Sequence, residues 1–247
     1  MITAELIILI SGVFLLAGTV KGTVGIGLPT ASIGMLTLFI DARLAISLVV
    51  LPMLISNAWQ VYREGMVVET FKSYWRFGVA LMLVIAMMTS VTAKIDENLL
   101  VMILGVVILL FSVSNLVRMP PRLPPRYDAI AQWIAGILAG LLGGLTAIWS
   151  PPTVIYLLAR RVDKNEFVRA SGVLILLGSI PLSLGFWRAG LLTGDTALVS
   201  LGMIVPTLIG FTIGEYIRRR LQADRFRIVV LLIFMAMGLN LIGKAIF

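Results

Sequence analysis

The sequence predicts an all-α protein that crosses a membrane many times, built as two inverted repeats of about five apolar segments each. Of its 247 residues, 60% are hydrophobic and only 13% are charged, and the mean hydropathy is +1.06. These values are typical of membrane proteins and lie outside the range of soluble globular chains. Two further observations support the prediction: the halves of the chain resemble each other, and Lys and Arg are unevenly divided between the loops.

Ten apolar runs follow one another along the chain. Several approach the roughly 20 residues that a helix needs to span the hydrocarbon. The runs are 4–20, 28–40, 44–62, 74–93, 99–117, 129–147, 151–159, 167–187, 196–217 and 228–246. Two of them, 28–40 and 151–159, are too short to cross as straight helices, and whether they cross or re-enter stays open. We interpret the first run as a retained membrane segment and not a secretory signal, because the only charge at its start is Glu5 and a basic n-region is missing.

A linker rich in Pro and Arg, 118–128, separates a first half, 1–117, from a second half, 129–247. Short matches recur in both halves in the same order and at a nearly constant spacing, which predicts an internal repeat. The matches are Gly22-x-x-Gly25 before Pro29 with Gly140-x-x-Gly143 before Pro151, Asp41 with Asp163, Tyr62-Arg63 with Trp187-Arg188, and Asn115 with Asn240.

The basic residues indicate how the segments are oriented. With five segments in each half, one side of the membrane receives fifteen Lys and Arg, and fusing each short run with its predecessor would divide them far more evenly. The fifteen are Arg63, Lys72, Arg76, Arg118, Arg122, Arg126, Arg160, Arg161, Lys164, Arg169, Arg218, Arg219, Arg220, Arg225 and Arg227, against Arg43, Lys94, Arg188 and Lys244 on the other side. The positive-inside rule then places both termini outside the cytoplasm and the linker inside it. An odd number of segments per half turns the second repeat upside down, as in inverted-repeat transporters.

Each half carries a Gly/Pro-rich break at a matching place, KGTVGIGLP at 21–29 and GGLTAIWSPP at 143–152. The first is not a phosphate loop, because it lacks the G-x-x-x-x-G-K-[ST] pattern. A break exposes unpaired peptide groups, which are tolerated at membrane depth only inside protein or along a wet cavity. Paired breaks in inverted halves therefore predict a transport site, and we expect each to be the turn of a broken or re-entrant hairpin.

The chemistry of the breaks fits an anion. Helix starts after each break present free N–H groups and a positive dipole end, hydroxyl groups add donors, and Lys21 adds a full positive charge. Asn57 and Gln60 share one face of the third segment. The predicted substrate-binding residues are Lys21, Gly22, Gly25, Gly27, Pro29, Thr30, Asn57, Gln60, Trp149, Ser150, Pro151, Pro152 and Thr153.

Plainer interpretations stand beside these. The glycines are also the small residues that let membrane helices pack closely. The ammonium of Lys21 can instead snorkel to an interface, and the amides of Asn57 and Gln60 can bind neighbouring helices together. Glu215, the one acidic residue inside an apolar run, is expected to form an interfacial ion pair with Arg218 or Arg219.

The stretches KGTVGIGLP (21–29), LPMLISNAWQ (51–60) and GLLGGLTAIWSPPTVIYL (140–157) resemble the TauE/SafE family of membrane transporters, also called the toluene sulfonate uptake permease family. The resemblance covers essentially the whole chain as two tandem repeats. It implies a bacterial or archaeal inner-membrane carrier of small organosulfur anions such as sulfite, sulfonates or sulfoacetate. Leu28 follows Gly27 where many members have a more glycine-rich form, which leaves the substrate open.

Composition excludes several other functions. The chain has no His and no Cys, no H-E-x-x-H motif and no acidic pair inside an apolar segment, so neither an enzyme nor a metal or other cofactor is expected. The net charge of +8 is explained by orientation and not by nucleic acid. The expected partners are a small anionic substrate and the lipid bilayer. A coupling ion (proton or sodium), a homodimer, a passive anion channel, a carrier of other small organic anions and a subunit without transport of its own remain open.

Overall fold

The computed structural model describes residues 4–116, 120–220 and 223–246, and this part of the chain is all-helical. Its elements are α1 (Ala4–Val24), α2 (Leu28–Leu36), α3 (Ala42–Glu64), α4 (Val67–Thr92), α5 (Glu97–Leu116), η1 (Pro125–Tyr127), α6 (Asp128–Thr146), α7 (Ser150–Ala159), α8 (Lys164–Arg188), α9 (Gly194–Gly202), α10 (Ile204–Arg220) and α11 (Ala223–Ile246). Within these residues seven helical stretches are long and apolar enough to cross a membrane. The prediction of a multi-pass all-α protein is confirmed, and α2 and α7 are short helices where the short apolar runs were found.

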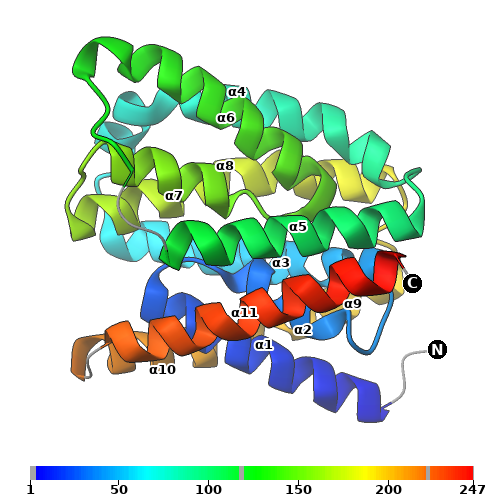
Figure 1. Cartoon of the computed structure of the whole chain (residues 1–247). Helices are drawn as coiled ribbons and strands as arrows, with labels where there is room; N and C mark the ends of the chain where they lie inside the picture. Colours follow the sequence, from blue (N-terminus) through cyan, green and yellow to red (C-terminus); the bar gives the residue numbers. More distant parts are fainter. Residues whose placement is uncertain (1–3, 117–119, 221–222, 247) are drawn as a thin grey trace.

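The helices lie side by side with their axes roughly aligned (Figure 1). α4 packs along α6 on one side of the bundle, and α1 packs along α10 on the opposite side. α3 and α8 pack on each other between these two pairs, while α5 packs along α11. The short helix α2 packs against α1, α3, α5 and α11, and α7 packs against α5, α6 and α8, which is where a helix broken at membrane depth can be shielded from lipid.

Glycines set the distance between the paired helices. A Cβ added at Gly18 would collide with the Thr207 carbonyl, and one added at Gly22 would collide with the Phe211 carbonyl. Gly140 in α6 is just as tightly packed, 2.6 Å from Val84 of α4 when a Cβ is built on it. Small residues let two backbones approach and gain dispersion contacts that lipid cannot replace. The structure thus gives Gly22 the packing role that was the alternative to substrate binding.

Two prolines interrupt the backbone hydrogen bonding of helices. The predicted apolar segment 196–217 lies within one candidate membrane span, Gly194–Arg218, which is interrupted between α9 and α10. Pro206 has no N–H for the carbonyl of Gly202, four residues earlier, and its ring crowds that carbonyl, so α9 ends there. Pro52 inside α3 likewise frees the Leu48 carbonyl, and Ser200 of α9 donates a hydrogen bond to it at 2.8 Å.

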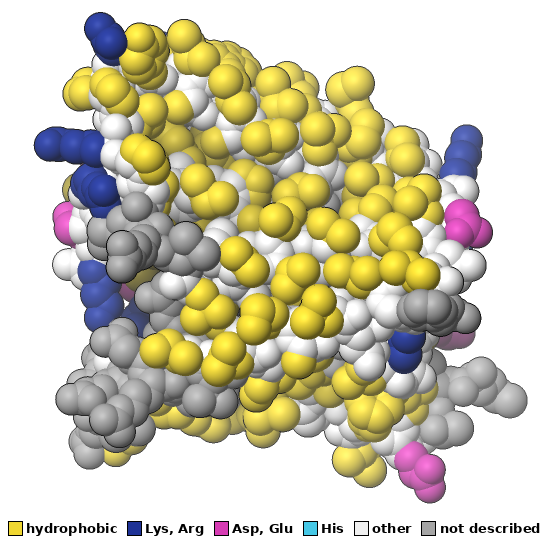
Figure 2. Space-filling view, in the orientation of Figure 1, with side chains coloured by type: hydrophobic (Ala, Val, Ile, Leu, Met, Phe, Trp, Pro, Cys, Tyr) yellow, Lys and Arg dark blue, Asp and Glu magenta, His cyan; other side chains and the backbone are white. Residues whose placement is uncertain are grey.

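The two ends of the bundle differ in charge. Figure 2 shows hydrophobic side chains over the middle of one face and Lys and Arg gathered mainly at one end, where α10 ends and α8 begins. At the other end lie the first turn of α1 and the last turn of α11. Residues 118–119 of the predicted linker, and the side chains of Arg219, Arg220, Arg225 and Arg227, lie outside the described residues.

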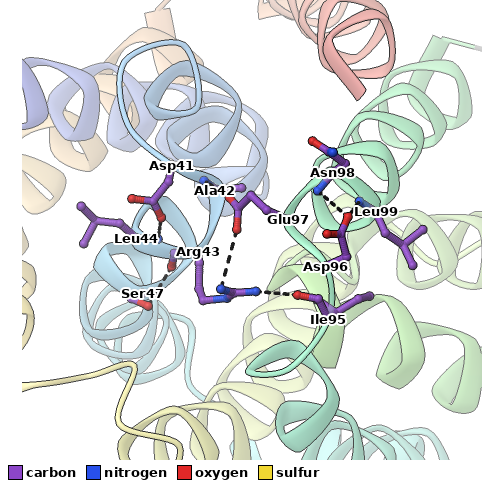
Figure 3. A network of polar contacts seen from close by, with 10 residues as sticks. All are labelled: Asp41, Ala42, Arg43, Leu44, Ser47, Ile95, Asp96, Glu97, Asn98 and Leu99. Carbon is purple, nitrogen blue, oxygen red and sulfur yellow. Dashed lines mark hydrogen bonds and ion pairs between the residues drawn. The ribbon is translucent and has the colours of Figure 1, made fainter. Parts of the chain in front are cut away.

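A polar network lies at the end of the bundle away from the basic residues (Figure 3). Arg43, at the start of α3, donates to the Ile95 carbonyl at 2.6 Å and faces the Glu97 carboxylate at 3.8 Å. Glu97 also accepts from the Ala42 N–H at 3.0 Å, and Asp41 caps α3. These contacts bind the loop after α2 to the loop before α5 and hold the C-terminal end of α2 in place.

We expect Gly18→Ala to lower the thermal unfolding midpoint in detergent, by the equivalent of about 1–3 kcal/mol, because α1 and α10 must separate to admit the methyl group. Gly12→Ala is the matched control on the same helix, since nothing lies within 4 Å of a Cβ there; it should be neutral or slightly stabilising. Circular dichroism of both purified variants measures the difference. Equal midpoints would show that the α1–α10 contact does not limit stability.

Candidate functional site

Two three-residue breaks separate α1 from α2 and α6 from α7: Gly25–Gly27 and Ala147–Trp149. In each, the residue that follows the long helix has positive φ, 91° at Gly25 and 59° at Ala147. Each short helix then begins with Pro in its first turn, as the sequence predicted. Both breaks contain fewer residues than the predicted stretches 21–29 and 143–152.

The residues of the first break take distinct positions. Lys21 belongs to the last turn of α1 and not to the break itself. Gly27 is the N-cap of α2 with φ 101°, a conformation that favours glycine. Pro29 fills the first turn of α2, so its missing N–H leaves no unsatisfied donor. The free N–H groups of this turn include that of Thr30, whose side chain is fully buried.

The Lys21 ammonium lies inside the bundle. The residue is 1% exposed, and its Nζ donates to Ser56 Oγ of α3 at 3.0 Å. The same Nζ lies 5.6 Å from the centre of the Phe211 ring of α10. In the part of the chain that the structure describes, no carboxylate pairs with it. The ammonium therefore does not snorkel to an interface, and one hydroxyl and one aromatic face compensate it incompletely.

Polar side chains of α2 and α3 lie buried with unused hydrogen-bonding atoms. Gln60 Nε2 donates to the Val168 carbonyl of α8 at 3.1 Å and makes a longer contact, 3.5 Å, with the Gly25 carbonyl, so it connects α3, α8 and the first break. Asn57 donates to a carbonyl of its own helix. Gln60 Oε1, Asn57 Oδ1 and Thr30 Oγ1 have no partner. The Thr30 hydroxyl can donate to an anion, whereas the two amide oxygens are acceptors and require water or another donor.

The second break is built around Trp149. Its ring lies between α6 and α8, because a Cβ at Gly143 would be 2.6 Å, and one at Gly178 3.0 Å, from the ring. The indole Nε1 is buried without a partner. Ser150 is the first residue of α7 and is buried. The Thr153 hydroxyl donates back to the Trp149 carbonyl at 2.8 Å, so its proton is already in use.

Pro151 and Pro152 line a separate apolar cavity of about 1030 Å³. Most of its other lining residues are aliphatic side chains of α5, α6 and α7, among them Leu110, Ile134 and Ile155. The structure thus places these two prolines in an apolar setting.

A cavity of about 330 Å³ extends from the first break toward the basic end of the bundle. Since a water molecule occupies about 30 Å³, this volume suits a small solute. Two cations, Lys164 and Arg218, stand among its lining residues, and Lys164 is exposed. The full lining is Thr23, Val24, Ile26, Asn115, Val154, Leu158, Val162, Lys164, Phe167, Val168 and Arg218.

The cavity has residues from both halves of the chain. Thr23, Val24 and Ile26 come from α1 and the first break, and Val154 and Leu158 come from α7. The structure thus brings the first break next to the short helix of the second half. Trp149, Ser150 and Thr153 are not among the lining residues of this cavity.

Asp163 fixes the start of α8 beside this cavity. Its carboxylate accepts hydrogen bonds from the N–H groups of Glu166 and Asn165, and these bonds lower its pKa. The exposed Lys164, which lines the cavity, is the next residue and forms the first turn of that helix.

The sequence missed several of these residues. Ser56, the hydrogen-bond partner of Lys21, precedes Asn57 and lies one turn before Gln60, so a search for polar residues on one helix face would have found it. In the sequence, Arg63 indicates only the orientation of the segments in the membrane. In the structure it pairs with Glu215 of α10. That pair joins residues 152 positions apart in the chain, which no local pattern reveals.

Comparison with protein families decides the identity. The model of the sulfite exporter TauE/SafE family matches residues 10–241. The chain belongs to the TauE/SafE family. Searches among curated proteins and among solved structures found no match.

Membership in the TauE/SafE family makes this chain a membrane transporter and not an enzyme. The family description, sulfite exporter, gives sulfur anions as the class of substrate. The resemblance first found in the glycine- and proline-rich stretches is confirmed over nearly the whole chain.

We expect Ala147→Gly to raise the unfolding midpoint, because an alanine in the left-handed region is strained by about 1 kcal/mol and glycine is not. Ala135→Gly, in the helical part of α6, is the matched control and should lower the midpoint by the equivalent of about 1 kcal/mol. Thermal unfolding of the two variants in the same detergent measures both shifts. Shifts of the same sign would contradict the strain at Ala147.

Proposed function

We propose that this TauE/SafE protein is a secondary carrier of sulfite or a small sulfonate, which binds at Lys21 beside the first break. The observation that carries the proposal is the Lys21 ammonium, which is 1% exposed and has no carboxylate partner among the described residues. A buried cation is strongly disfavoured unless an anion joins it. The smaller cavity is lined by Thr23 and Val24, which follow Lys21 by two and three residues in the chain. This cavity supplies a route for that anion.

The donors around this position suit an oxyanion. The Lys21 ammonium and the Thr30 hydroxyl can each donate to a sulfite or sulfonate oxygen, whereas the Ser56 hydroxyl already donates to the Met53 carbonyl at 3.3 Å. The first turn of α2, with its free N–H groups and positive dipole end, adds further stabilisation. Arg218 and Lys164 favour the entry of anions over cations.

Inverted repeats and alternating access form part of the proposal. Support comes from the packing: α1 lies along α10 as α6 lies along α4, while α3 with α8 and α5 with α11 are helices in matching positions of the two halves. The breaks at Gly25 and Ala147 are 122 residues apart, as are the capping residues Asp41 and Asp163. An odd number of segments per half makes such repeats inverted. The basic end is then cytoplasmic and both termini are not.

We further propose that the cavity is the cytoplasmic entrance of the carrier, and that the network around Arg43 closes the opposite end. The cavity contains exposed Lys164 at the basic end of the bundle. Arg43 binds Ile95 and Glu97 at the other end. Access would alternate when one end closes and the other opens around Lys21. A coupling proton or sodium ion and a homodimer remain compatible with this arrangement.

We expect Lys21→Gln to weaken the binding of radiolabelled sulfite to the purified protein by about 30-fold or more, because losing a buried charged partner costs roughly 2–5 kcal/mol. Lys94→Gln is the matched control: Lys94 is exposed in the loop after α4 and should leave affinity unchanged. Thermal unfolding of both variants checks that they are folded. Unchanged affinity in Lys21→Gln would remove Lys21 from the site.

The alternative, a passive small-anion channel, differs in one measurement. Proteoliposomes loaded with unlabelled sulfite should take up external labelled sulfite faster than empty ones, because a carrier returns from the inner side more readily when it is occupied. A channel shows no such trans-stimulation. The same assay with acetate or another small carboxylate inside tests the second alternative, a carrier of other organic anions, which predicts equal stimulation by both.

A further inference from the structure

Three residues of α10 form a line along one face of the helix, spaced by four and then three residues: Phe211, Glu215 and Arg218. The first of them lies under the Lys21 ammonium. The last lines the cavity at the basic end. The middle residue, Glu215, is therefore placed between the cavity and Lys21, and the proposed function gives it no role.

Glu215 is held by two guanidinium groups. Arg63 of α3 forms an ion pair and hydrogen bond with its Oε2. Arg218 Nη2 lies 3.6 Å from its Oε1. The residue is 7% exposed, whereas the side chain of Arg63 keeps 35% of its surface exposed and that of Arg218 16%. The carboxylate is thus covered while both cations remain partly accessible.

This arrangement has the chemistry of an oxyanion site that is already filled. Guanidinium groups bind carboxylates and other oxyanions through paired N–H donors. A sulfite or sulfonate presents oxygens of the same charge and similar spacing to those of a carboxylate. The cations along this path, Arg218, Arg63 and Lys21, lead from the cavity into the bundle, and Glu215 is the single described carboxylate paired with any of them.

We propose that Arg63 and Arg218 form a second anion site between the cavity and Lys21, and that the Glu215 carboxylate occupies it until a substrate anion displaces it. The inference rests on the proposed function and deepens it, because it assigns an intermediate position on the substrate's route. While Glu215 is in place, the two arginines are neutralised in part and do not hold an entering anion too tightly. When the anion takes its place, the carboxylate turns away and repels the anion onward to Lys21.

A purely structural role for the ion pair between Arg63 and Glu215 gives different expectations. As a link between α3 and α10, it would stabilise the fold, and Glu215→Gln would lower the unfolding midpoint without changing how anions enter. If Arg63 and Arg218 instead form an anion site that Glu215 occupies, removal of the Glu215 charge must make the cavity more attractive to anions. Removal of the Arg63 charge must do the opposite.

The absence of cysteine from the chain allows one to be placed as a sensor. Val24 lines the cavity and is partly exposed, so Val24→Cys reports on what enters. We expect the ratio of its reaction rates with an anionic sulfonatoethyl methanethiosulfonate and a cationic trimethylammonioethyl methanethiosulfonate to rise several-fold when Glu215→Gln is added. The ratio should fall when Arg63→Gln is added instead.

Asp195→Asn is the control, since Asp195 is an exposed carboxylate in the first turn of α9, away from the proposed path. It should leave the ratio unchanged. If Glu215→Gln fails to fold, Arg63→Gln and Arg218→Gln in the same Val24→Cys background still test the proposal, because each should lower the ratio of the anionic to the cationic reaction rate. A ratio that does not change in any of the three variants overturns the proposal and leaves Glu215 a structural residue.

Sulfite binding separates this proposal from the proposed function. Glu215→Gln should bind radiolabelled sulfite about tenfold more tightly, since an internal competitor has been removed. If Lys21→Gln loses sulfite while Glu215→Gln changes neither affinity nor the reaction ratio, the second site is wrong and the function stands. If the unmodified protein binds no sulfite while the reaction ratio responds to Glu215→Gln as expected, the proposed substrate is wrong and the anion site stands.

Discussion

Hydrocarbon offers no partner to a peptide N–H or C=O group, and this constraint determines where the helices of the protein can be interrupted. The chain breaks at Gly25–Gly27 and Ala147–Trp149, and each break is enclosed by long helices. The enclosure is possible because Gly18 and Gly22 bring α10 against α1, and glycines of α6 bring α4 close in the same way. The freed groups are then satisfied inside the protein or face the cavity.

The same constraint accounts for the polar contacts between distant parts of the chain. Pro52 releases the Leu48 carbonyl, and Ser200 of α9 satisfies it. The Val168 carbonyl of α8 accepts from Gln60 of α3. In both cases a helix of one half supplies a hydrogen bond to a helix of the other. The interior is therefore held by a few specific bonds between halves in addition to apolar packing. Thr30 Oγ1, Asn57 Oδ1, Gln60 Oε1 and Trp149 Nε1 are among the buried atoms left without a partner.

Much of this organisation could be predicted because hydropathy and Gly/Pro punctuation are local signals. The sequence predicts the apolar runs, the short helices and the helix starts at Pro29 and Pro151. The interruption between α9 and α10 was not predicted, because a hydropathy average over a segment does not register a single proline. The missing N–H of Pro206 was nevertheless a usable signal. Pairings such as Arg63 with Glu215 were not predictable, because they depend on which helix faces lie together after folding.

The two breaks differ in one residue, and that difference governs how easily each can bend. Gly25 reaches its positive φ without a steric penalty, so many backbone conformations remain open to the first break. Ala147 reaches a similar conformation against its own Cβ, and the ring of Trp149 is wedged between Gly143 and Gly178. The second break is consequently the stiffer of the two. The two breaks therefore lie at similar points in the chain but differ in backbone freedom, because glycine permits more conformations at positive φ than alanine does.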